Sequence, residues 1–243
     1  MKIALVGYGK MGHAIERIAL SRGHEVTCTV DAGEETRFDS APFREADVVI
    51  EFSRPEAAVG NYRRIIAAGK PLVSGTTGWT ARLDEVEALL KEKDAVMFWT
   101  SNFSIGVNLF RRVNSLLASI MTGFPQYKPA MKEIHHIHKL DHPSGTAITL
   151  ADDIIAANGR LEAWTENSDE AERPDTILID HEREGEVPGT HIISWESEVD
   201  RITIEHRAFS RDGFALGAVM AAEWLHANPE ARGLVGMDAM LNL

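Results

Sequence analysis

Short apolar runs alternate with stretches of helical periodicity in the N-terminal part of the chain. The apolar runs predict strands over residues 2–6, 25–30, 48–51, 71–74 and 95–99. Apolar residues at helical spacing predict helices over residues 13–22, 56–68 and 83–91. A chain that alternates strands with helices forms a parallel sheet with helices on both faces. We therefore predict an α/β domain of the Rossmann type, built on a doubly wound parallel sheet.

The pattern changes after residue 103. A stripe of apolar residues at helical spacing predicts a core helix, and it comprises Val107, Phe110, Val113, Leu116, Leu117 and Ile120. Strand-like segments follow at residues 130–138, 176–180, 191–196 and 201–208, and the last two are expected to pair. A second helix is expected over residues 147–158, and the acidic segment 162–175 is expected to be a loop.

These segments predict a second domain of the α+β kind, built on an open mixed sheet with a helix or two on one face. The last predicted helix, residues 214–226, is expected to return to the first domain. The domain boundaries are therefore placed at 1–103 and 214–243 for the first domain, and at 104–213 for the second.

The composition narrows the function classes. A net charge of -12 argues against nucleic acid and anionic membranes as partners. No apolar segment approaches the roughly 18 residues of a membrane span. The single cysteine, Cys28, lies in an apolar run, which fits a small buried residue in a reducing compartment. The cytoplasm is the expected location.

A glycine loop connects the first predicted strand to the first helix, and it reads Gly7-Tyr8-Gly9-Lys10-Met11-Gly12. In a dinucleotide site the first glycine makes the tight turn, the second lets the backbone approach a pyrophosphate, and the third packs helix on strand. Asp31 ends the second predicted strand, where a carboxylate reads the adenosine ribose. A glycine turn in another α/β protein remains the alternative.

Asp31 favours NADH, because a carboxylate there repels the 2′-phosphate of NADPH. Lys10 lies in the glycine loop and could reach a phosphate, so NADPH stays open as a second cofactor. Two further loops follow predicted strands of the same sheet and are candidates to line the nicotinamide end. They comprise Gly75, Thr76 and Thr77, and Thr100, Ser101, Asn102 and Phe103. Taken alone, each is equally compatible with a plain turn.

The densest group of titratable residues lies between Glu133 and Thr146 and reads E-I-H-H-I-H-K-L-D-H-P-S-G-T. As a strand, it would point His135, Ile137 and Lys139 to one face, and His136 and His138 to the other. Ser144, Gly145 and Thr146 then occupy a helix start, where free amides favour a carboxylate or phosphate.

A dinucleotide domain beside a His/Lys group is typical of a nicotinamide-dependent reductase of a small anionic substrate. Histidine is the natural proton donor near neutral pH, and lysine holds a carboxylate. Three alternatives stay open: zinc held by His135, His136 and His138, a nucleotide sensor without catalysis, and a reductase of another imino or keto acid. A structural role is expected for His138 and His142.

The segment 133–147 resembles the signature of the dihydrodipicolinate reductase family. Other segments resemble the same family in the same order, and they are E-F-S-R-P-E, G-T-T-G, S-N-F-S-I-G-V-N, R-E-G-E-V-P-G-T-H and R-A-F-S-R-D-G-F-A-L-G-A. The resemblance covers nearly the whole chain. It implies two domains with the reductase site between them, a homotetramer built through the second sheet, and conjugate reduction of a cyclic unsaturated dicarboxylate on the diaminopimelate route to lysine.

The resemblance also implies roles for single residues. His135 would be the acid/base, His136 a substrate contact, and Lys139 both catalytic and substrate-binding. Gly145 and Thr146 would hold a substrate carboxylate. The glycine loop, Asp31 and the two later loops fall on dinucleotide contacts, and no metal is implied. One departure is that no arginine directly follows Asp31, as it does in members that accept NADPH well.

Overall fold

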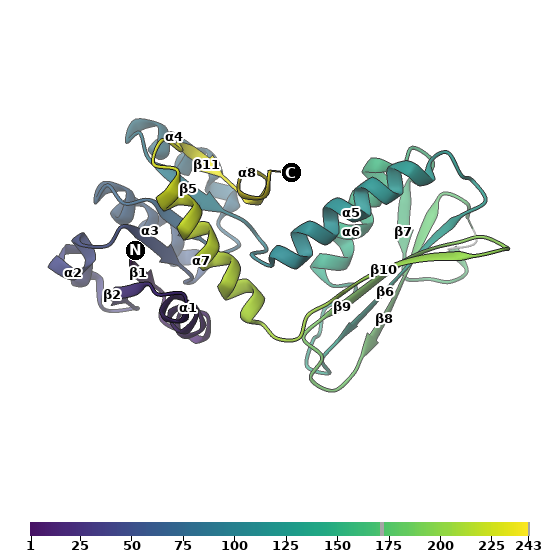
Figure 1. Ribbon diagram of the computed structural model, residues 1–243, viewed down its shortest axis with the longest axis horizontal. Coiled ribbons are helices and arrows are strands. Elements are labelled where there is room, and N and C mark those ends of the chain that lie inside the picture. The colour runs from purple at the N-terminus through teal and green to yellow at the C-terminus, as the bar shows by residue number, and fades with distance from the viewer. Residues whose placement is uncertain (171–172, 243) are drawn as a thin grey trace. The chain divides into compact units, whose positions relative to one another are not determined.

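The structure, a computed structural model, describes residues 1–170 and 173–242 (Figure 1). The chain divides into two compact units. Unit 1 comprises Met1–Ile105 and Asp212–Leu243, and unit 2 comprises Gly106–Arg211. Among the described helices, none has the length and apolar character needed to cross a bilayer.

Unit 1 contains a six-stranded sheet in the order β11-β5-β4-β3-β1-β2, with every neighbouring pair parallel. The doubly wound parallel sheet is thus confirmed. Its strands are β1 (Lys2–Val6), β2 (Glu25–Val30), β3 (Val48–Glu51), β4 (Leu72–Ser74), β5 (Val96–Trp99) and β11 (Gly233–Val235).

Helices cover both faces of this sheet, because consecutive residues of its central strands are apolar and side chains of a strand point alternately to the two faces. Ile3 and Leu5 of β1 pack with α1 (Lys10–Ser21) and α7 (Asp212–Ala227). Ala4 and Val6 pack on the other face with α3 (Pro55–Ala67) and α4 (Leu83–Glu92). The return of the last long helix, α7, to unit 1 agrees with the prediction from its apolar pattern.

Several short elements of unit 1 do not appear in the sequence pattern. They are β11, η1 (Glu35–Asp39), α2 (Ala41–Arg44), η2 (Thr80–Arg82) and α8 (Met237–Leu241). Each has five residues or fewer, which is too short to show a period of 3.6 or 2.

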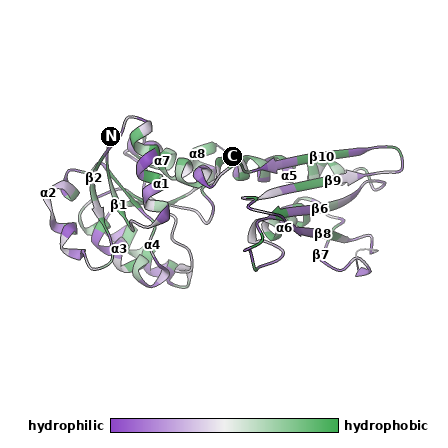
Figure 2. Ribbon diagram, turned by 90° about the horizontal axis from the view of Figure 1, so that it is seen from below, coloured by the Kyte–Doolittle hydropathy of each residue, from purple (hydrophilic) through white to green (hydrophobic). Residues whose placement is uncertain are grey.

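Unit 2 contains a five-stranded mixed sheet in the order β10-β9-β6-β8-β7, visible in Figure 2. The strands are β6 (Lys128–His135), β7 (Ala163–Thr165), β8 (Thr176–Arg183), β9 (Thr190–Glu196) and β10 (Arg201–Arg207). β6 pairs parallel with β8 and antiparallel with β9, and β9 pairs antiparallel with β10 as predicted.

Two helices cover one face of the mixed sheet, namely α5 (Ile105–Met121) and α6 (Gly145–Ala157). Their buried apolar residues, which include Phe110 and Ala118 of α5, form one core with Met131, Ile179, Ile193 and the fully buried Trp195. The prediction of an α+β unit with helices on one face is therefore correct.

Three predictions about unit 2 are wrong in detail. Val113, Leu116 and Ile120 of the stripe predicted as core are at least half exposed, so only part of that stripe of α5 packs inward. The strand expected over residues 130–138 ends at His135, because the amide of Lys139 bonds the carbonyl of His136 and closes a turn. The segment 162–175, expected to be a loop, contains β7, which pairs with β8 at the sheet edge. Residues 171–172 of that segment lie outside the described residues.

Candidate active site

The glycine loop of unit 1 has the shape that a dinucleotide requires. Gly7 has φ +86°, and a Cβ there would lie 2.0 Å from the carbonyl oxygen of Phe52. A Cβ on Gly12 would lie 2.5 Å from the carbonyl oxygen of Gly7. Gly9, the residue before α1, has no atom within 4 Å of its Cβ position. The first and third glycines are thus needed for packing, whereas the second leaves open space beside a helix start.

A cavity of about 570 Å³ opens beside this loop at the carboxyl ends of β1, β2 and β3. Of the predicted cofactor contacts, Gly7, Gly9 and Asp31 line it. The position is the point where the strand order reverses between β1 and β3, which is where doubly wound sheets bind ligands. The open backbone at Gly9, the uncapped start of α1 and the carboxylate of Asp31 fit a dinucleotide.

The remaining loop residues are held by local contacts. The Tyr8 hydroxyl donates to Glu16 of α1, and the Tyr8 ring lies 4.1 Å from that of His13 between centroids. Lys10 is exposed, and Met11 packs against the core of unit 1. Lys10 therefore keeps a solvent-exposed ammonium at the first turn of α1.

Acidic groups gather around Asp31. Glu35, from η1, lines the same cavity. Arg37 follows in the same segment, but its guanidinium lies 3.2 Å from Glu34, and the Asp31 amide donates to Glu34 as well. A 2′-phosphate bound here would face Asp31 and Glu35, while the nearby Arg37 is already paired.

Thr76 is the centre of a buried network rather than an exposed contact. Its hydroxyl donates to the buried carboxylate of Glu51 at 2.8 Å and accepts the amide of Ser53 at 2.8 Å. The indole N–H groups of Trp79 and Trp99 donate to its carbonyl oxygen. Burial raises the pKa of Glu51. The hydroxyl groups that donate hydrogen bonds to this carboxylate lower its pKa, but by less than burial raises it. This network fixes Gly75–Thr77 against the end of β3, and of the two threonines only Thr77 is exposed.

The loop after β5 is ordered by its own side chains. The Thr100 hydroxyl accepts the amide of Asn102 at 3.1 Å, and the Asn102 side chain accepts the amide of Ser104. Phe103 is buried against Phe52 and Phe98, while Ser101 is exposed. Phe103 is therefore a core residue, whose side chain is not free for a ligand.

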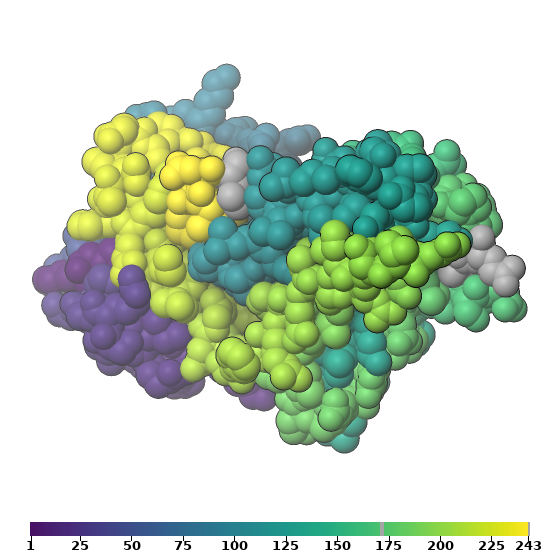
Figure 3. Space-filling view, turned by 45° about the vertical axis from the view of Figure 1, so that its right-hand side comes forward, coloured from purple at the N-terminus to yellow at the C-terminus, as the bar shows by residue number. Residues whose placement is uncertain are grey.

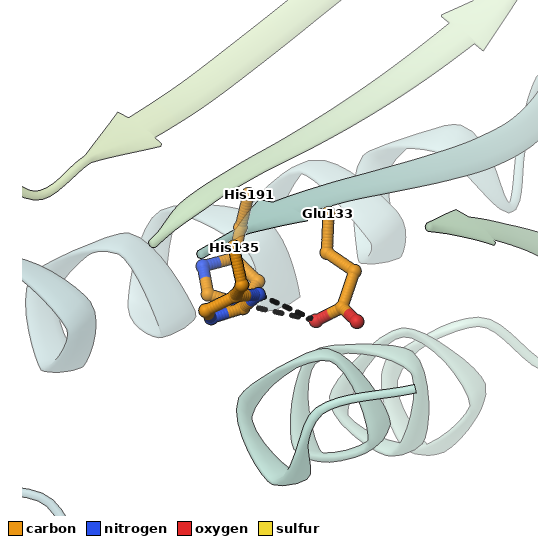
Figure 4. Close-up of side chains that lie close together, drawn as sticks. All are labelled: Glu133, His135 and His191. Atoms are coloured by element: carbon orange, nitrogen blue, oxygen red, sulfur yellow. Dashed lines mark ion pairs between the residues drawn. The ribbon is translucent and has the colours of Figure 1, made fainter. Parts of the chain in front are cut away.

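In unit 2 a fully buried carboxylate, Glu133, organises the histidine segment (Figure 4). Oε2 of Glu133 lies 3.2 Å from Nδ1 of His135, an ion-pair distance outside hydrogen-bond geometry, and 3.9 Å from Nε2 of His191. Oε1 accepts the amide of Ser144 and a guanidinium N–H of Arg183, both at 3.1 Å. Glu133 and His135 lie on the same face of β6, because they are two residues apart.

The charges of this cluster follow from its surroundings. Burial alone would raise the pKa of Glu133, but His135, the Ser144 amide and Arg183 together lower it to about 2. Burial, together with the cationic groups nearby, lowers the pKa of His191 to about 4. At neutral pH Glu133 is therefore an anion and His191 is neutral. An anion that faces Nδ1 of His135 favours a proton on that nitrogen and leaves Nε2 for chemistry.

Arg183 also fixes the loop that carries Lys139. Its guanidinium donates to the carbonyl oxygens of Lys139, at 3.3 Å, and Asp141, at 2.7 Å. The ammonium of Lys139 donates to both carboxylate oxygens of Asp141, at 2.8 and 2.7 Å. The ammonium of Lys139 is thus held by a carboxylate of the same loop, which shows that this position suits a carboxylate partner.

The predicted pairing of His136 with His138 on one strand face is wrong, because the strand ends before both. Nε2 of His136 lies 3.1 Å from the Arg211 guanidinium, and His138 pairs with Glu186 at 2.8 Å. Within the described residues, the groups whose ligand atoms converge are Glu133–His135–His191 and His142–Glu166–His181. The trio His135, His136 and His138, which the sequence left open as an alternative zinc site, is not among them.

The start of α6 is a candidate anion-binding position, called the anion seat below, which is formed by the backbone amides of Gly145 and Thr146. Ser144 is the N-cap, and its buried hydroxyl accepts the amide of Ala147 at 3.2 Å. Gly145 is exposed, and no atom lies within 4 Å of its Cβ position. The amides of Gly145 and Thr146 belong to the first turn, which has no carbonyl partners within the helix. Glu133, through the Ser144 amide, connects this seat to His135.

The residue patterns do not single out Glu133, Arg183, His191 or Arg211 as functional. Glu133 begins the histidine segment, but the other three lie on strands or loops more than 40 residues away. Two signals point to them. Glu133 lies in an alternating strand, and an ionised carboxylate is rarely buried without a partner. The family-like segment R-E-G-E-V-P-G-T-H begins at Arg183 and ends at His191, and R-A-F-S-R-D-G-F-A-L-G-A contains Arg211.

Comparison with known proteins gives matches along the whole chain. Residues 1–103 match the family model for the N-terminus of dihydrodipicolinate reductase, and residues 106–241 match that for its C-terminus. A 4-hydroxy-tetrahydrodipicolinate reductase of Christiangramia forsetii is 47% identical over 93% of this chain and 92% of its own length. One from Archaeoglobus fulgidus is 33% identical, over 99% of this chain and all of its own.

A solved structure supports the same fold. A dipicolinate-bound dihydrodipicolinate reductase from a Paenisporosarcina species superposes with a TM-score of 0.79 at 21% identity, over 100% of this chain and 99% of the other. The two family models together cover both units, and the identity to the relatives extends over nearly the full length. The chain therefore belongs to the dihydrodipicolinate reductase family.

Proposed function

We propose that this chain catalyses the NAD(P)H-dependent reduction of 4-hydroxy-tetrahydrodipicolinate, or of the dihydrodipicolinate derived from it, to tetrahydrodipicolinate in lysine biosynthesis. Family membership supports the substrate class. The observation that carries the proposal is the buried anion Glu133, which contacts His135 and, through Ser144 and Arg183, the start of α6 and the loop of Lys139.

Unit 1 would hold the cofactor. The backbone at Gly7–Gly12 and the start of α1 receive the pyrophosphate, and Asp31 accepts the ribose hydroxyls. A nicotinamide bound there would supply the hydride, which in the proposed reaction adds to the ring carbon distal to the imine. We propose NADH as the preferred cofactor, because Asp31 and Glu35 both line the cavity and would repel a 2′-phosphate. Two cations would allow NADPH as a weaker alternative, namely Lys10 in the glycine loop and Arg54, which lines the cavity.

Unit 2 would hold the two substrate carboxylates. One pairs with Lys139, whose ammonium is already placed between two carboxylate oxygens of Asp141. The other accepts the first-turn amides of Gly145 and Thr146. His136, held by Arg211, supplies a further contact, and the two cations counter the overall negative charge of the chain locally.

His135 would complete the reaction as the proton donor. As hydride adds to the distal carbon, electrons flow toward the ring nitrogen and leave an enamine. The enamine carbon next to the one that received the hydride then takes a proton from His135 or from a water that His135 holds, which restores the imine. Glu133 keeps the imidazole oriented and stabilises the cation before transfer. Gly189 makes room for this ring, since a Cβ there would lie 3.1 Å from Nε2 of His135.

The test is oxidation of NADH and NADPH, followed at the nicotinamide absorbance, with freshly generated substrate and a chelator present. Turnover is expected, with NADH preferred. The His135→Gln variant is expected to bind NADH normally but to lose at least about 100-fold in turnover, the size of a general acid contribution. Wild-type protein that binds NADH without any turnover would contradict the proposal and favour a sensor.

We also propose a homotetramer assembled through unit 2. The sheet face opposite α5 and α6 carries the half-buried apolar residues Ile134, Leu178 and Ile192. A second apolar surface, the exposed side of α5, comprises Leu109, Val113, Leu116 and Ile120, and α5 lies open in the space-filling view (Figure 3). The apolar stripe on α5 is of the kind that is typical of interfaces, whereas on the sheet face the ion pairs of Lys132 with Asp180 and Glu182 lie among the apolar residues. Light scattering after size exclusion is expected to give four times the 26.8 kDa chain mass.

A further inference from the structure

Three side chains outside the site described above converge at the edge of the sheet in unit 2. Nδ1 of His142 lies 2.9 Å from Oε1 of Glu166, and Nδ1 of His181 lies 3.0 Å from the same oxygen. The two imidazole rings stack, with centroids 4.4 Å apart and planes at 13°. All three side chains reach solvent, with exposed fractions of 54%, 29% and 34% in that order.

The three residues come from separate segments. His142 lies in the loop before α6, Glu166 directly follows β7, and His181 lies in β8. Because β7 and β8 are paired in parallel register, Glu166 and His181 are carried by one rigid sheet edge. His142 comes from the loop. The backbone just before it is held in place, because the guanidinium of Arg183 donates a hydrogen bond to the carbonyl oxygen of Asp141.

We propose that His142, Glu166 and His181 form a binding site for a divalent transition metal ion, with zinc as the best fit. Two imidazoles and a carboxylate, with a fourth position for water, are a donor set that zinc uses in proteins. Ligand atoms about 2.0–2.1 Å from a tetrahedral ion lie roughly 3.3 Å from one another. The observed separations of 2.9 and 3.0 Å from Oε1 need only a small expansion to admit the ion.

The side chains can accept an ion without a change of fold. Each imidazole must carry its proton on Nε2 to offer the Nδ1 lone pair, and this is a tautomer exchange with no loss of charge. The rings must also turn so that both lone pairs point at one ion. His142 has that freedom because it is the most exposed of the three.

The local charge favours a cation. The segment 162–170 adds the carboxylates of Glu162, Asp169 and Glu170 to that of Glu166. Asp180 and Glu182, the neighbours of His181, point to the opposite face of β8 and pair with Lys132, so they do not count toward this field. A negative field of this kind raises the local concentration of a divalent cation. The other convergent group, Glu133–His135–His191, differs in this respect, because the Arg183 guanidinium already bonds its carboxylate.

An ion at this site would tie the loop to the sheet edge. His142 precedes the N-cap Ser144 by two residues, so the ion would fix the chain that leads into the anion seat of α6. The site is therefore expected to stabilise unit 2 and to act on substrate affinity through the loop, without touching the reacting atoms.

The experiment is titration of chelator-treated full-length protein with ZnCl₂ by calorimetry, and with Co²⁺ followed by its visible absorption. We expect one site per chain and a tetrahedral Co²⁺ spectrum. His142→Ala, Glu166→Gln and His181→Ala are each expected to weaken binding at least about tenfold, the scale seen even for residues that only support ligands. NADH binding and circular dichroism report whether each variant is folded.

His138→Ala is the matched control. His138 is also an exposed histidine paired with one glutamate, Glu186, at 2.8 Å, but within the described residues it has no third ligand group. Its variant is expected to bind Zn²⁺ like the wild type. The proposal is wrong if the wild type binds no Zn²⁺, or if folded His142→Ala binds it as well as His138→Ala does. His142 is exposed, so its variant carries the test even if His181→Ala does not fold.

Discussion

Glu133 is an ionised carboxylate with no exposed surface, and it is stable there because Arg183, the Ser144 amide and His135 surround it. A buried charge costs several kcal/mol unless such partners compensate it. The same partners are the residues that the proposed reaction needs in place. Stability and catalytic geometry in unit 2 therefore depend on one side chain.

Replacing Glu133 by Gln is expected to destabilise unit 2 by about 3 kcal/mol, because Arg183 is left without its anion. Chemical denaturation followed by circular dichroism measures the loss. Glu182→Gln is the control, since it removes an exposed carboxylate that pairs with Lys132 at 2.7 Å and is expected to cost less than about 1 kcal/mol. Equal losses in the two variants would show that the buried ion cluster contributes no more to the free energy of unfolding than an exposed ion pair does.

The lowered pKa of His191 predicts that the fold loses stability in acid. Its pKa is about 4 in the folded chain against an ordinary 6.5, so the unfolded chain takes up a proton first as the pH falls. Stability is therefore full above pH 6.5 and is lost between pH 6.5 and 4, by up to about 3 kcal/mol. In the His191→Gln variant, the free energy of unfolding is expected to depend less on pH between pH 6.5 and 4 than in the wild type. Outside that window the two proteins are expected to show the same pH dependence.

The contribution of Glu133 lies in a different window. Its pKa is lowered from 4.5 to about 2, so its share of the stability is present above pH 4.5 and is lost as the pH falls toward 2. Urea midpoints measured from pH 7 to 4 thus report on His191 together with His206, whose pKa burial also lowers, and the difference between the wild type and His191→Gln isolates the share of His191. A His191→Gln curve parallel to that of the wild type would contradict this assignment.

At the scale of elements, the glycine loop separates packing from binding. Gly7→Ala is expected to disrupt unit 1, because its φ is positive and the new Cβ would overlap the Phe52 carbonyl. Gly9→Ala is expected to fold normally, since its Cβ position is open, but to weaken NADH binding at least about tenfold. Thermal unfolding and NADH fluorescence test the pair. Normal NADH affinity in Gly9→Ala would place the pyrophosphate elsewhere.

The sequence predicts strands best where both faces of a strand are buried. β1 and β3 begin and end at the predicted residues, because each is a nearly continuous apolar run that is buried along most of its length. β2 also has the predicted bounds, although it alternates apolar residues with threonines and is only partly buried. β6 is predicted too long, since the alternation continues past His135 while the backbone turns away. β7 and β11 have three residues each and carry no period at all.

The candidate site is predictable only where its residues are neighbours in sequence. The segment 133–146 shows His135, Lys139 and the helix start together, and its resemblance to a family gives their roles. Arg183 and His191 come from strands that pair with β6, and no local pattern fixes which strand lies beside another. Sheet register, a tertiary property, therefore determines the part of the site that the sequence does not show.

At the scale of the whole molecule, each unit has its own buried core and its own ligand chemistry. The cavity at the glycine loop lies in unit 1, whereas the anion seat of α6 lies in unit 2. A chain organised in this way can bind a dinucleotide and a dicarboxylate with separate sets of residues. The two ligands should then protect different backbone amides.

Hydrogen exchange tests whether the dinucleotide binds to unit 1 and the dicarboxylate to unit 2. NADH is expected to slow exchange at the amides of the glycine loop and the first turn of α1, because they lie at the proposed pyrophosphate site. Dipicolinate, a stable planar dicarboxylate, is expected to slow exchange at the start of α6 and in the loop of Lys139. Lys139→Ala should weaken only the dipicolinate effect. Protection by dipicolinate at the glycine loop alone, with none at α6, would move the substrate site out of unit 2 and remove His135 from the reaction.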